Sequence, residues 1–442
     1  MPALRFARFT KIALLAMLIA WLSLALWNSA KPLPPGTHSA SQVARLAESD
    51  VDFLYDTPQR HDAGARELAA IDHAEQLIMI DRSPVAPELA QHLLARKRVR
   101  PNLKIVLVTD PANQAYGGSA PQTLTALETA GIIVARVRLD RLRDSNPLYS
   151  GLWRLLFGWW SDPFEEAPGR ITPAAWARMR NAKADQRQLV IADDGSGGWL
   201  AVVSPAGSGA GAGADRSGAG ACLMLRGSLA RAMIAGELQI AAWSTDDDRL
   251  PAAPQMTARG VGSIDARYLT EGAIESALLD AIAAAGRDDE ISIAVENFSR
   301  RRLIAAALSA AARGAHLQVL LARNLVPNQA VAGELKEGGG GHIEVRWYAA
   351  APGGAYPRLL IVRHRADLWM NFGSANFTRR NLDDFNLESG VELRMPTWAA
   401  PARVVTQYFS NIWSSASDAG LMDEPAAYWR YRIAEATGLS SF

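Results

Sequence analysis

The chain has 442 residues, of which 49% are hydrophobic and 21% are charged, and its formal net charge at pH 7 is +1. This length exceeds what one ordinary hydrophobic core accommodates, so it predicts two domains or two fused halves. The near-neutral charge argues against a nucleic-acid-binding protein with a markedly basic surface.

The N-terminus contains an apolar run from Ile12 to Trp27, preceded by three basic residues. Because about 16–18 residues nearly suffice for a membrane span, residues 1–30 are predicted to form a transmembrane anchor. A cleaved signal segment is the alternative, since residues 28–30 are Asn-Ser-Ala. The basic residues favour a bacterial-type inner-membrane protein with its main domain outside the cytoplasm, or a secreted protein after cleavage.

After a linker over residues 31–48, strands alternate with helices through a first unit predicted to span residues 49–260. This alternation predicts an α/β fold with a central sheet. The predicted strands are 51–56, 76–80, 103–109 and 132–137, and the predicted helices are 65–74, 87–96 and 123–130.

The segment 152–160 holds Trp153, Trp159 and Trp160. Tryptophan favours boundaries between apolar and wet phases, so one interpretation is contact with the surface of a bilayer. Burial inside the protein is the other interpretation, since aromatic clusters are usually buried.

A Gln-Arg-Gln segment precedes the next apolar strand. Gln186 and Gln188 lie two residues apart, and Asp193 ends the apolar run 189–192. A strand over 199–203 and Ser204 follow, and the Gly/Ala/Ser-rich residues 205–221 are predicted to form a mobile loop.

The second half, predicted to span residues 261–442, repeats this order. Its predicted helices are 271–284, 299–313 and 331–336, and its predicted strands are 290–295, 316–321 and 343–348. A repeat of this size predicts two similar lobes, because a solenoid would have a period of roughly 20–50 residues. Residues 416–442 are predicted to form a C-terminal helix and tail.

Polar residues surround the last predicted strands. Tyr356 and Arg358 precede the strand 359–362, and a second strand, 368–372, leads into Gly373. Four further polar residues follow at fixed spacing. They are Ser374 and Asn376, and then Asn386 with Glu388.

This stretch resembles the second catalytic segment of the phospholipase D superfamily, which includes cardiolipin synthase-like proteins. The family pattern is His-x-Lys-x4-Asp, a strand, Gly-Ser-x-Asn, and later Asn-x-Glu. Residues 373–378 (Gly-Ser-Ala-Asn-Phe-Thr) and 386–388 match it. The slots for His, Lys and Asp hold Tyr356, Arg358 and Arg363 in the second half and Gln186, Gln188 and Asp193 in the first. The resemblance implies two phospholipase D-like lobes, each a mainly parallel mixed sheet flanked by helices, with one site between them.

In this family one histidine attacks phosphorus, the other histidine transfers protons, and lysines and asparagines hold the phosphate oxygens. The resemblance implies catalytic positions at Tyr356, Arg358, Gln186, Gln188 and Asp193. It implies phosphate-binding positions at Arg358, Ser374, Asn376 and Glu388. An amide is neither a nucleophile nor a general acid near neutral pH, so the site is predicted to be degenerate.

Two alternatives to a degenerate anion site follow from the same residues. Tyr356 would be a nucleophile if Arg358 lowered the pKa of its phenol and a base such as His364 or His61 stood beside it. The polar groups would instead be structural if they satisfied one another. No histidine pair has the spacing of metal ligands, so neither a metal nor a cofactor is predicted, and the single Cys222 excludes a multi-cysteine zinc site.

The sequence therefore predicts a membrane-anchored phospholipase D-like protein that binds phosphodiester lipids without catalysis. One rival is an active phosphodiesterase or phosphatidyltransferase with non-standard residues. The other is a non-enzymatic scaffold for a protein partner. A nucleic-acid ligand is not expected, because the charge is low and an apolar N-terminal segment is present.

Overall fold

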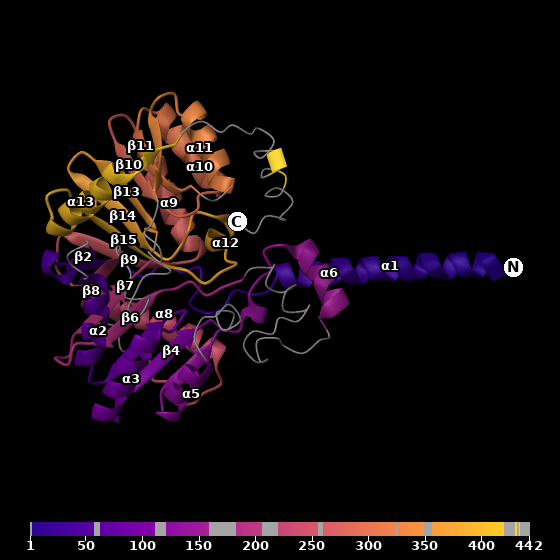
Figure 1. The fold of residues 1–442 in the computed structure, drawn as a ribbon, viewed down its shortest axis with the longest axis horizontal. Coiled ribbons are helices and arrows are strands. Elements are labelled where there is room, and N and C mark those ends of the chain that lie inside the picture. Colours follow the sequence, from indigo (N-terminus) through magenta and orange to yellow (C-terminus); the bar gives the residue numbers. More distant parts are fainter. Residues whose placement is uncertain are drawn as a thin grey trace.

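The structure is a computed structural model that describes residues 2–56, 62–110, 121–158, 183–205, 220–254, 260–323, 326–348 and 356–419, together with residues 429, 430 and 433. Two α/β lobes lie against each other, and helix α1 (Pro2–Ser29) projects away from them (Figure 1).

The first lobe is built on a seven-stranded sheet. β3, β4 and β5 are parallel, and the pairs β3–β6, β6–β7, β7–β8 and β8–β2 are antiparallel. All five residues of β3 are buried, as expected for a strand covered on both faces. In sheet order the strands are β2 (Val51–Tyr55), β8 (Ala221–Arg226), β7 (Trp199–Val203), β6 (Leu189–Asp193), β3 (Leu77–Asp81), β4 (Lys104–Thr109) and β5 (Ile133–Arg136).

The second lobe has a nine-stranded sheet. β10, β11 and β12 are parallel, and the other neighbours are antiparallel. In sheet order the strands are β1 (Ala44–Leu46), β9 (Ile264–Thr270), β15 (Ser389–Pro396), β14 (Asp367–Gly373), β13 (Leu359–His364), β10 (Glu290–Ala294), β11 (His316–Ala322), β12 (Ile343–Tyr348) and β16 (Ser417–Asp418).

The two sheets have the same strand order once β1 and β16 are set aside. β2-β8-β7-β6-β3-β4-β5 of the first lobe corresponds to β9-β15-β14-β13-β10-β11-β12 of the second. The predicted duplicated α/β fold is therefore confirmed. β1 lies within the predicted linker yet extends the sheet of the second lobe, and β16 forms where a C-terminal helix is predicted.

Helices cover the outer faces of both sheets (Figure 1). In the first lobe they are α2 (Asp62–His73), α3 (Pro87–Val99) and α5 (Pro121–Thr129), with short 3-10 turns at Glu48–Asp50 and Leu139–Arg141. In the second lobe they are α9 (Gly272–Ala284), α10 (Arg301–Ala312) and α11 (Val326–Gly338), with the short α12 (Arg379–Leu382).

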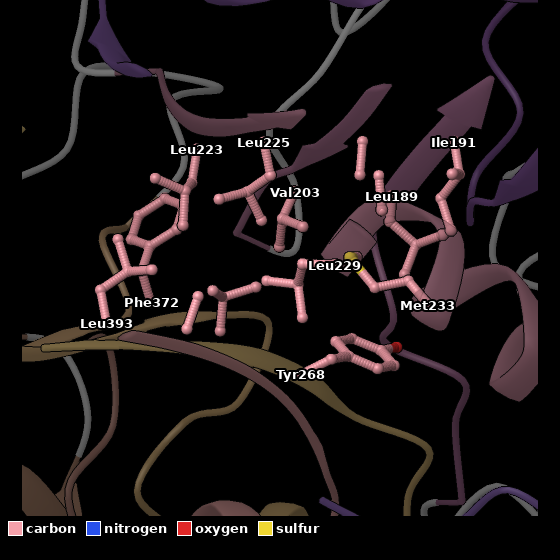
Figure 2. Close-up of a cluster of buried hydrophobic side chains, with 14 of the residues drawn as sticks. Leu189, Ile191, Val203, Leu223, Leu225, Leu229, Met233, Tyr268, Phe372 and Leu393 are labelled. Atoms are coloured by element: carbon pink, nitrogen blue, oxygen red, sulfur yellow. The ribbon is translucent and has the colours of Figure 1, made fainter. Parts of the chain in front are cut away.

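Two further helices, α8 (Ser228–Ser244) and α13 (Ala400–Ser415), lie between the lobes and are not among the predicted elements. α8 packs on strands of the first sheet and on β9, and α13 packs on β12 and on β2. Tyr268, Phe372 and Leu393 of the second lobe meet Leu223 and Leu229 of the first in one apolar core (Figure 2). This shared core fixes the lobes against each other.

Helix α6 (Pro147–Phe157) lies across α1 near the lobes (Figure 1). The predicted tryptophan cluster falls partly here. Trp153 is buried, with 3% of its surface exposed, which agrees with the interpretation of burial. Trp159 and Trp160 lie outside the described residues.

Candidate functional site

Ser374 is held where β14 passes into the site. Its N–H donates to the Ser389 carbonyl at 2.8 Å, and its hydroxyl accepts from the Ser389 N–H at 3.0 Å. A Cβ on the preceding Gly373 would lie 2.1 Å from the same carbonyl oxygen, so only glycine permits this approach. The Gly-Ser pair thus places the Ser374 hydroxyl beside the start of β15.

Glu388 lies at the centre of the site and is fully buried. Its carboxylate accepts from the Ser374 hydroxyl at 2.5 Å and from the Asn381 amide. Burial raises the pKa of Glu388 to about 7, although these hydrogen bonds and the charge of Arg358 act to lower it. The carboxyl group therefore changes its protonation near neutral pH.

We expect Glu388→Gln to remove a pH-dependent loss of stability. A carboxyl group whose pKa is raised on folding stabilises the fold below about pH 4.5, and this stabilisation disappears as the pH rises through about 7. A shift of this size corresponds to about 3 kcal/mol. Chemical denaturation in detergent at pH 5 and pH 8 measures the free energy of unfolding. Between these pH values it should fall by about that much more in the wild type than in the variant. Equal decreases would contradict the raised pKa of Glu388.

Arg358 and Asn376 donate to the same oxygen of Glu296. The distances to Glu296 Oε2 are 3.1 Å from Arg358 Nη2 and 3.4 Å from Asn376 Nδ2. The Arg358 side chain is 6% exposed, whereas that of Glu296 is 38% exposed. Two donors therefore converge on one anionic oxygen that reaches them from the solvent side. We call Glu296, Arg358, Ser374, Asn376, Asn381 and Glu388 the Arg358 cluster.

Glu296 and Asn381 are members of the cluster that the motif comparison does not include. Glu296 follows β10, whose apolar run ends at Val295, so a polar residue at the end of a buried strand is the only local signal for it. Asn381 lies in α12, between Gly-Ser-x-Asn and Asn-x-Glu. Nothing in its sequence spacing distinguishes it from its neighbours.

Gln186 joins the cluster from the first lobe. Its side-chain oxygen accepts from Asn381 Nδ2 at 3.0 Å. The two lobes also pair their backbones here, since Gln186 N donates to Leu387 O at 2.9 Å and Leu387 N donates to Ala184 O at 3.0 Å. The structure thus brings Gln186 together with the Asn-x-Glu segment.

Gln188 does not take part in the cluster. Its oxygen accepts from Arg82 Nη1 at 2.7 Å, and its amide donates to Ser83 O at 2.8 Å, both within the first lobe. The resemblance implies a catalytic position for Gln188, whereas its described hydrogen bonds are made to Arg82 and Ser83. Its amide is committed to the segment that follows β3.

Asp193 and Arg363 lie at the far ends of β6 and β13 from the cluster. The Asp193 carboxylate accepts from the backbone N–H groups of Glu75, Gln76, Leu77 and Gly195, at 2.7–3.2 Å. Arg363 pairs with Glu290 across β13 and β10. These contacts give Asp193 a role in joining strands, through several charge-assisted hydrogen bonds.

Tyr356 is partly buried, and its ring packs edge-on against Tyr348 with 5.7 Å between centroids. His364 Nδ1 lies 2.6 Å from Asp289 Oδ1, at the other end of β13. Among the described residues, no hydrogen bond joins Tyr356 to a histidine, and His61 lies outside them. The described part of the chain therefore supplies no base for a Tyr356 nucleophile.

Arg187, between the two glutamines, occupies a buried charge network that sequence reasoning missed. Its partners differ from those of Gln186 and Gln188: one lies on α8 and the other directly after β9. It donates to Glu237 at 2.9 Å and to Glu271 at 2.7 Å. Glu271 also accepts from the Glu388 N–H at 2.9 Å, so this network holds the segment carrying Glu388.

Glu271 adopts a positive φ of 44°, a region that residues other than glycine seldom occupy. Its hydrogen bonds to Arg187, Glu388 and the His38 N–H hold it there. Such outliers tend to be located at functional sites, where the surrounding structure enforces them. Within the described ranges, no three His, Cys, Asp or Glu side chains are grouped to hold a metal ion.

Residues 278–413 match a family model described as cardiolipin synthase, PLD-like domain. This region contains all six residues of the Arg358 cluster. A comparison with curated protein sequences gives no significant match.

Two solved structures share the fold of most of the chain. Phosphatidylserine synthase from Haemophilus influenzae Rd KW20 is 11% identical with a TM-score of 0.59, and the alignment covers 96% of this chain and 99% of that one. Polyphosphate kinase from Porphyromonas gingivalis is 11% identical with a TM-score of 0.50, covering 88% of this chain and 53% of that one. At these identities the likeness concerns the fold alone. By the family model, residues 278–413 of the second lobe are similar to the phospholipase D-like domains of cardiolipin synthases, and the first lobe repeats the strand order of the second.

Proposed function

We propose that this protein binds the phosphodiester group of a phospholipid at the Arg358 cluster, without cleaving it, while α1 anchors it in a membrane. The observation that carries this proposal is the convergence of Arg358 and Asn376 on Glu296 Oε2. These are groups of the kind that hold non-bridging phosphate oxygens, and an arginine fork suits a phosphate. The Glu296 carboxylate then occupies the position that a phosphate oxygen would take.

Binding without cleavage follows from the groups in the histidine slots. The side-chain amide of Gln186 accepts a hydrogen bond from Asn381. Within the described residues, the ring contact of Tyr356 is with Tyr348, and no hydrogen bond joins Tyr356 to a histidine. Covalent catalysis needs an activated nucleophile with a base in reach. The fold therefore keeps donors for an anion while the proton-transfer groups of the family are replaced.

The membrane anchor rests on the exposed apolar surface of α1. Its segment Arg8–Ser29 has a mean hydropathy of 2.1, and only 6% of the most apolar stretch within it is buried against the rest of the protein. At 1.5 Å per residue, 22 residues extend about 33 Å, close to the roughly 30 Å hydrocarbon core of a bilayer. The basic residues at its start favour lobes outside the cytoplasm of a bacterial-type cell, or in the medium if the segment is cleaved.

Glu296→Gln is expected to tighten phosphodiester binding about tenfold, because it removes a carboxylate that repels the phosphate and competes with it for Arg358. A tenfold change in affinity corresponds to roughly 1.4 kcal/mol of binding free energy. Isothermal titration calorimetry on the full chain in maltoside micelles, with dihexanoylphosphatidylglycerol as ligand, measures this without background from other phosphates. Glu290→Gln is the matched control, since Glu290 pairs with Arg363 on the same two strands, far from the site. Equal affinities of the two variants would contradict the proposal, and no binding by any form would favour the scaffold.

The same preparations test for catalysis. Release of glycerol from phosphatidylglycerol, followed by mass spectrometry, should be absent for the wild type and for Tyr356→Phe. Turnover by the wild type that disappears in Tyr356→Phe would instead establish a phosphatidyltransferase or phosphodiesterase with a tyrosine nucleophile.

A further inference from the structure

Helix α6 leaves one apolar stripe exposed. Leu148, Leu152 and Leu156 are spaced four residues apart, so they lie on one face of the helix. They are 49%, 45% and 49% exposed, whereas Ser150, Gly151 and Trp153 are buried. A contiguous apolar patch on an exposed helix face marks a surface that contacts another phase or molecule.

The neighbour of α6 indicates which partner. Trp21 Nε1 of α1 donates to Leu148 O at 2.7 Å. A Cβ on Gly151 would lie 2.6 Å from Trp21 O and 3.1 Å from Ala25 N, so glycine permits the two helices to touch at their backbones. α6 therefore crosses α1 next to the apolar surface that faces outward on α1 (Figure 1). The leucine stripe therefore belongs to a helix that is packed directly on α1.

The segment before α6 is firmly held and carries cations. Asp144 N donates to Asn28 O at 3.1 Å, and the fully buried Asp144 carboxylate pairs with Arg154 at 3.0 Å and with Lys183. Arg143 donates to the backbone of Lys31 at 2.7 Å. Arg154 and Lys183 are paired with Asp144, so Arg143 is the cation of this segment that is placed to attract an anionic lipid headgroup.

The candidate site lies one contact away from this segment. Arg379, the first residue of α12, donates to Ser145 O at 2.5 Å. Asn381, two residues further on, donates to Glu388 and Gln186. The start of α6 and the Arg358 cluster are thus joined through α12, which lies on the side of the second lobe toward α6 (Figure 1).

We propose that α6 is an interfacial helix that lies on the bilayer surface with Leu148, Leu152 and Leu156 in the headgroup–acyl boundary, and that it holds the Arg358 cluster at the level of the lipid headgroups. Helices of this kind lie in the plane of the interface and bury an apolar face roughly 5–10 Å deep. The proposal rests on the membrane anchoring by α1 put forward above. Its occupant is the lipid bilayer, since α1 brings the stripe to that surface.

Spin labelling of the full chain tests this in vesicles of phosphatidylcholine and phosphatidylglycerol. Labels are introduced at Leu148→Cys, Leu152→Cys and Leu156→Cys, with Leu18→Cys on α1 as the lipid reference and Ser410→Cys on α13 as the water reference. The native Cys222 is buried, and burial raises the pKa of its thiol, so it competes little for the label. Power saturation then compares collisions with oxygen, which concentrates in lipid, and with a water-soluble nickel chelate.

The expected result is that labels on α6 collide more with oxygen than with nickel, as at position 18, and that the label at 410 shows the reverse. If labels on α6 collide with the nickel chelate as often as the label at position 410, while the label at position 18 is in lipid, the proposal for α6 is overturned and the membrane anchor is not. Nickel access at position 18 would overturn both. Spin–spin broadening between labels on α6 of different molecules would assign the stripe to a contact between copies and also overturn the proposal.

Discussion

Arg187→Met is expected to lower the free energy of unfolding by about 3–5 kcal/mol, because it leaves two buried carboxylates without their cation. The side chains of Arg187 and Glu237 are fully buried, and that of Glu271 is 1% exposed. Burial alone would lower the pKa of Arg187, but the two carboxylates raise it well above its usual range, so the guanidinium is charged. Glu271 belongs to the second lobe and also accepts from the Glu388 N–H, so the loss weakens the contact between the lobes next to the site.

Denaturant titration at pH 7 in detergent measures this loss. Arg249→Met is the matched control, because Arg249 forms an ion pair with Asp247 and its side chain is 53% exposed. An exposed pair contributes roughly 0–1 kcal/mol, so the control should unfold nearly as the wild type does. Equal losses in the two variants would show that the buried network does not stabilise the fold as described.

Arg358→Gln, introduced together with Glu296→Gln, is expected to weaken binding of dihexanoylphosphatidylglycerol about thirtyfold relative to Glu296→Gln alone. A hydrogen bond to a charged group contributes about 2 kcal/mol, which corresponds to that factor. The Glu296→Gln background is used because there the carboxylate no longer competes for Arg358, so the comparison isolates the guanidinium. Calorimetry in maltoside micelles gives both affinities.

Arg363→Gln in the same background is the control, since Arg363 lies on β13, the strand that directly follows Arg358, but pairs with Glu290 at its far end. It should leave the affinity unchanged. Thermal unfolding of each variant shows whether it is folded. A folded Arg358→Gln variant that binds as tightly as its control would exclude the Arg358 cluster as the phosphodiester site.

Much of the fold was accessible from local pattern. Buried strands appear as short apolar runs, so the positions of β3, β4, β10 and β11 were predicted to within a few residues. The duplication followed from the repeated order of these runs. The two central helices were missed, since α8 is apolar on several sides and α13 ends where a C-terminal helix was predicted to begin. Their burial depends on two sheets that face each other, which no single window of sequence contains.

The candidate site divides in the same way. The resemblance implies Ser374, Asn376 and Glu388 as site positions because the Gly-Ser-x-Asn and Asn-x-Glu motifs are local, and the glycine before Ser374 permits the close approach of β14 to β15 that positions its hydroxyl. The different partners of Gln186 and Gln188, the Glu296 carboxylate between Arg358 and Asn376, and the clamp from Arg187 to Glu271 depend on how the lobes pack. Charged side chains buried between two lobes take whichever partner the packing brings within about 3 Å, and residues 84 positions apart, such as Arg187 and Glu271, carry no sequence signal of that contact.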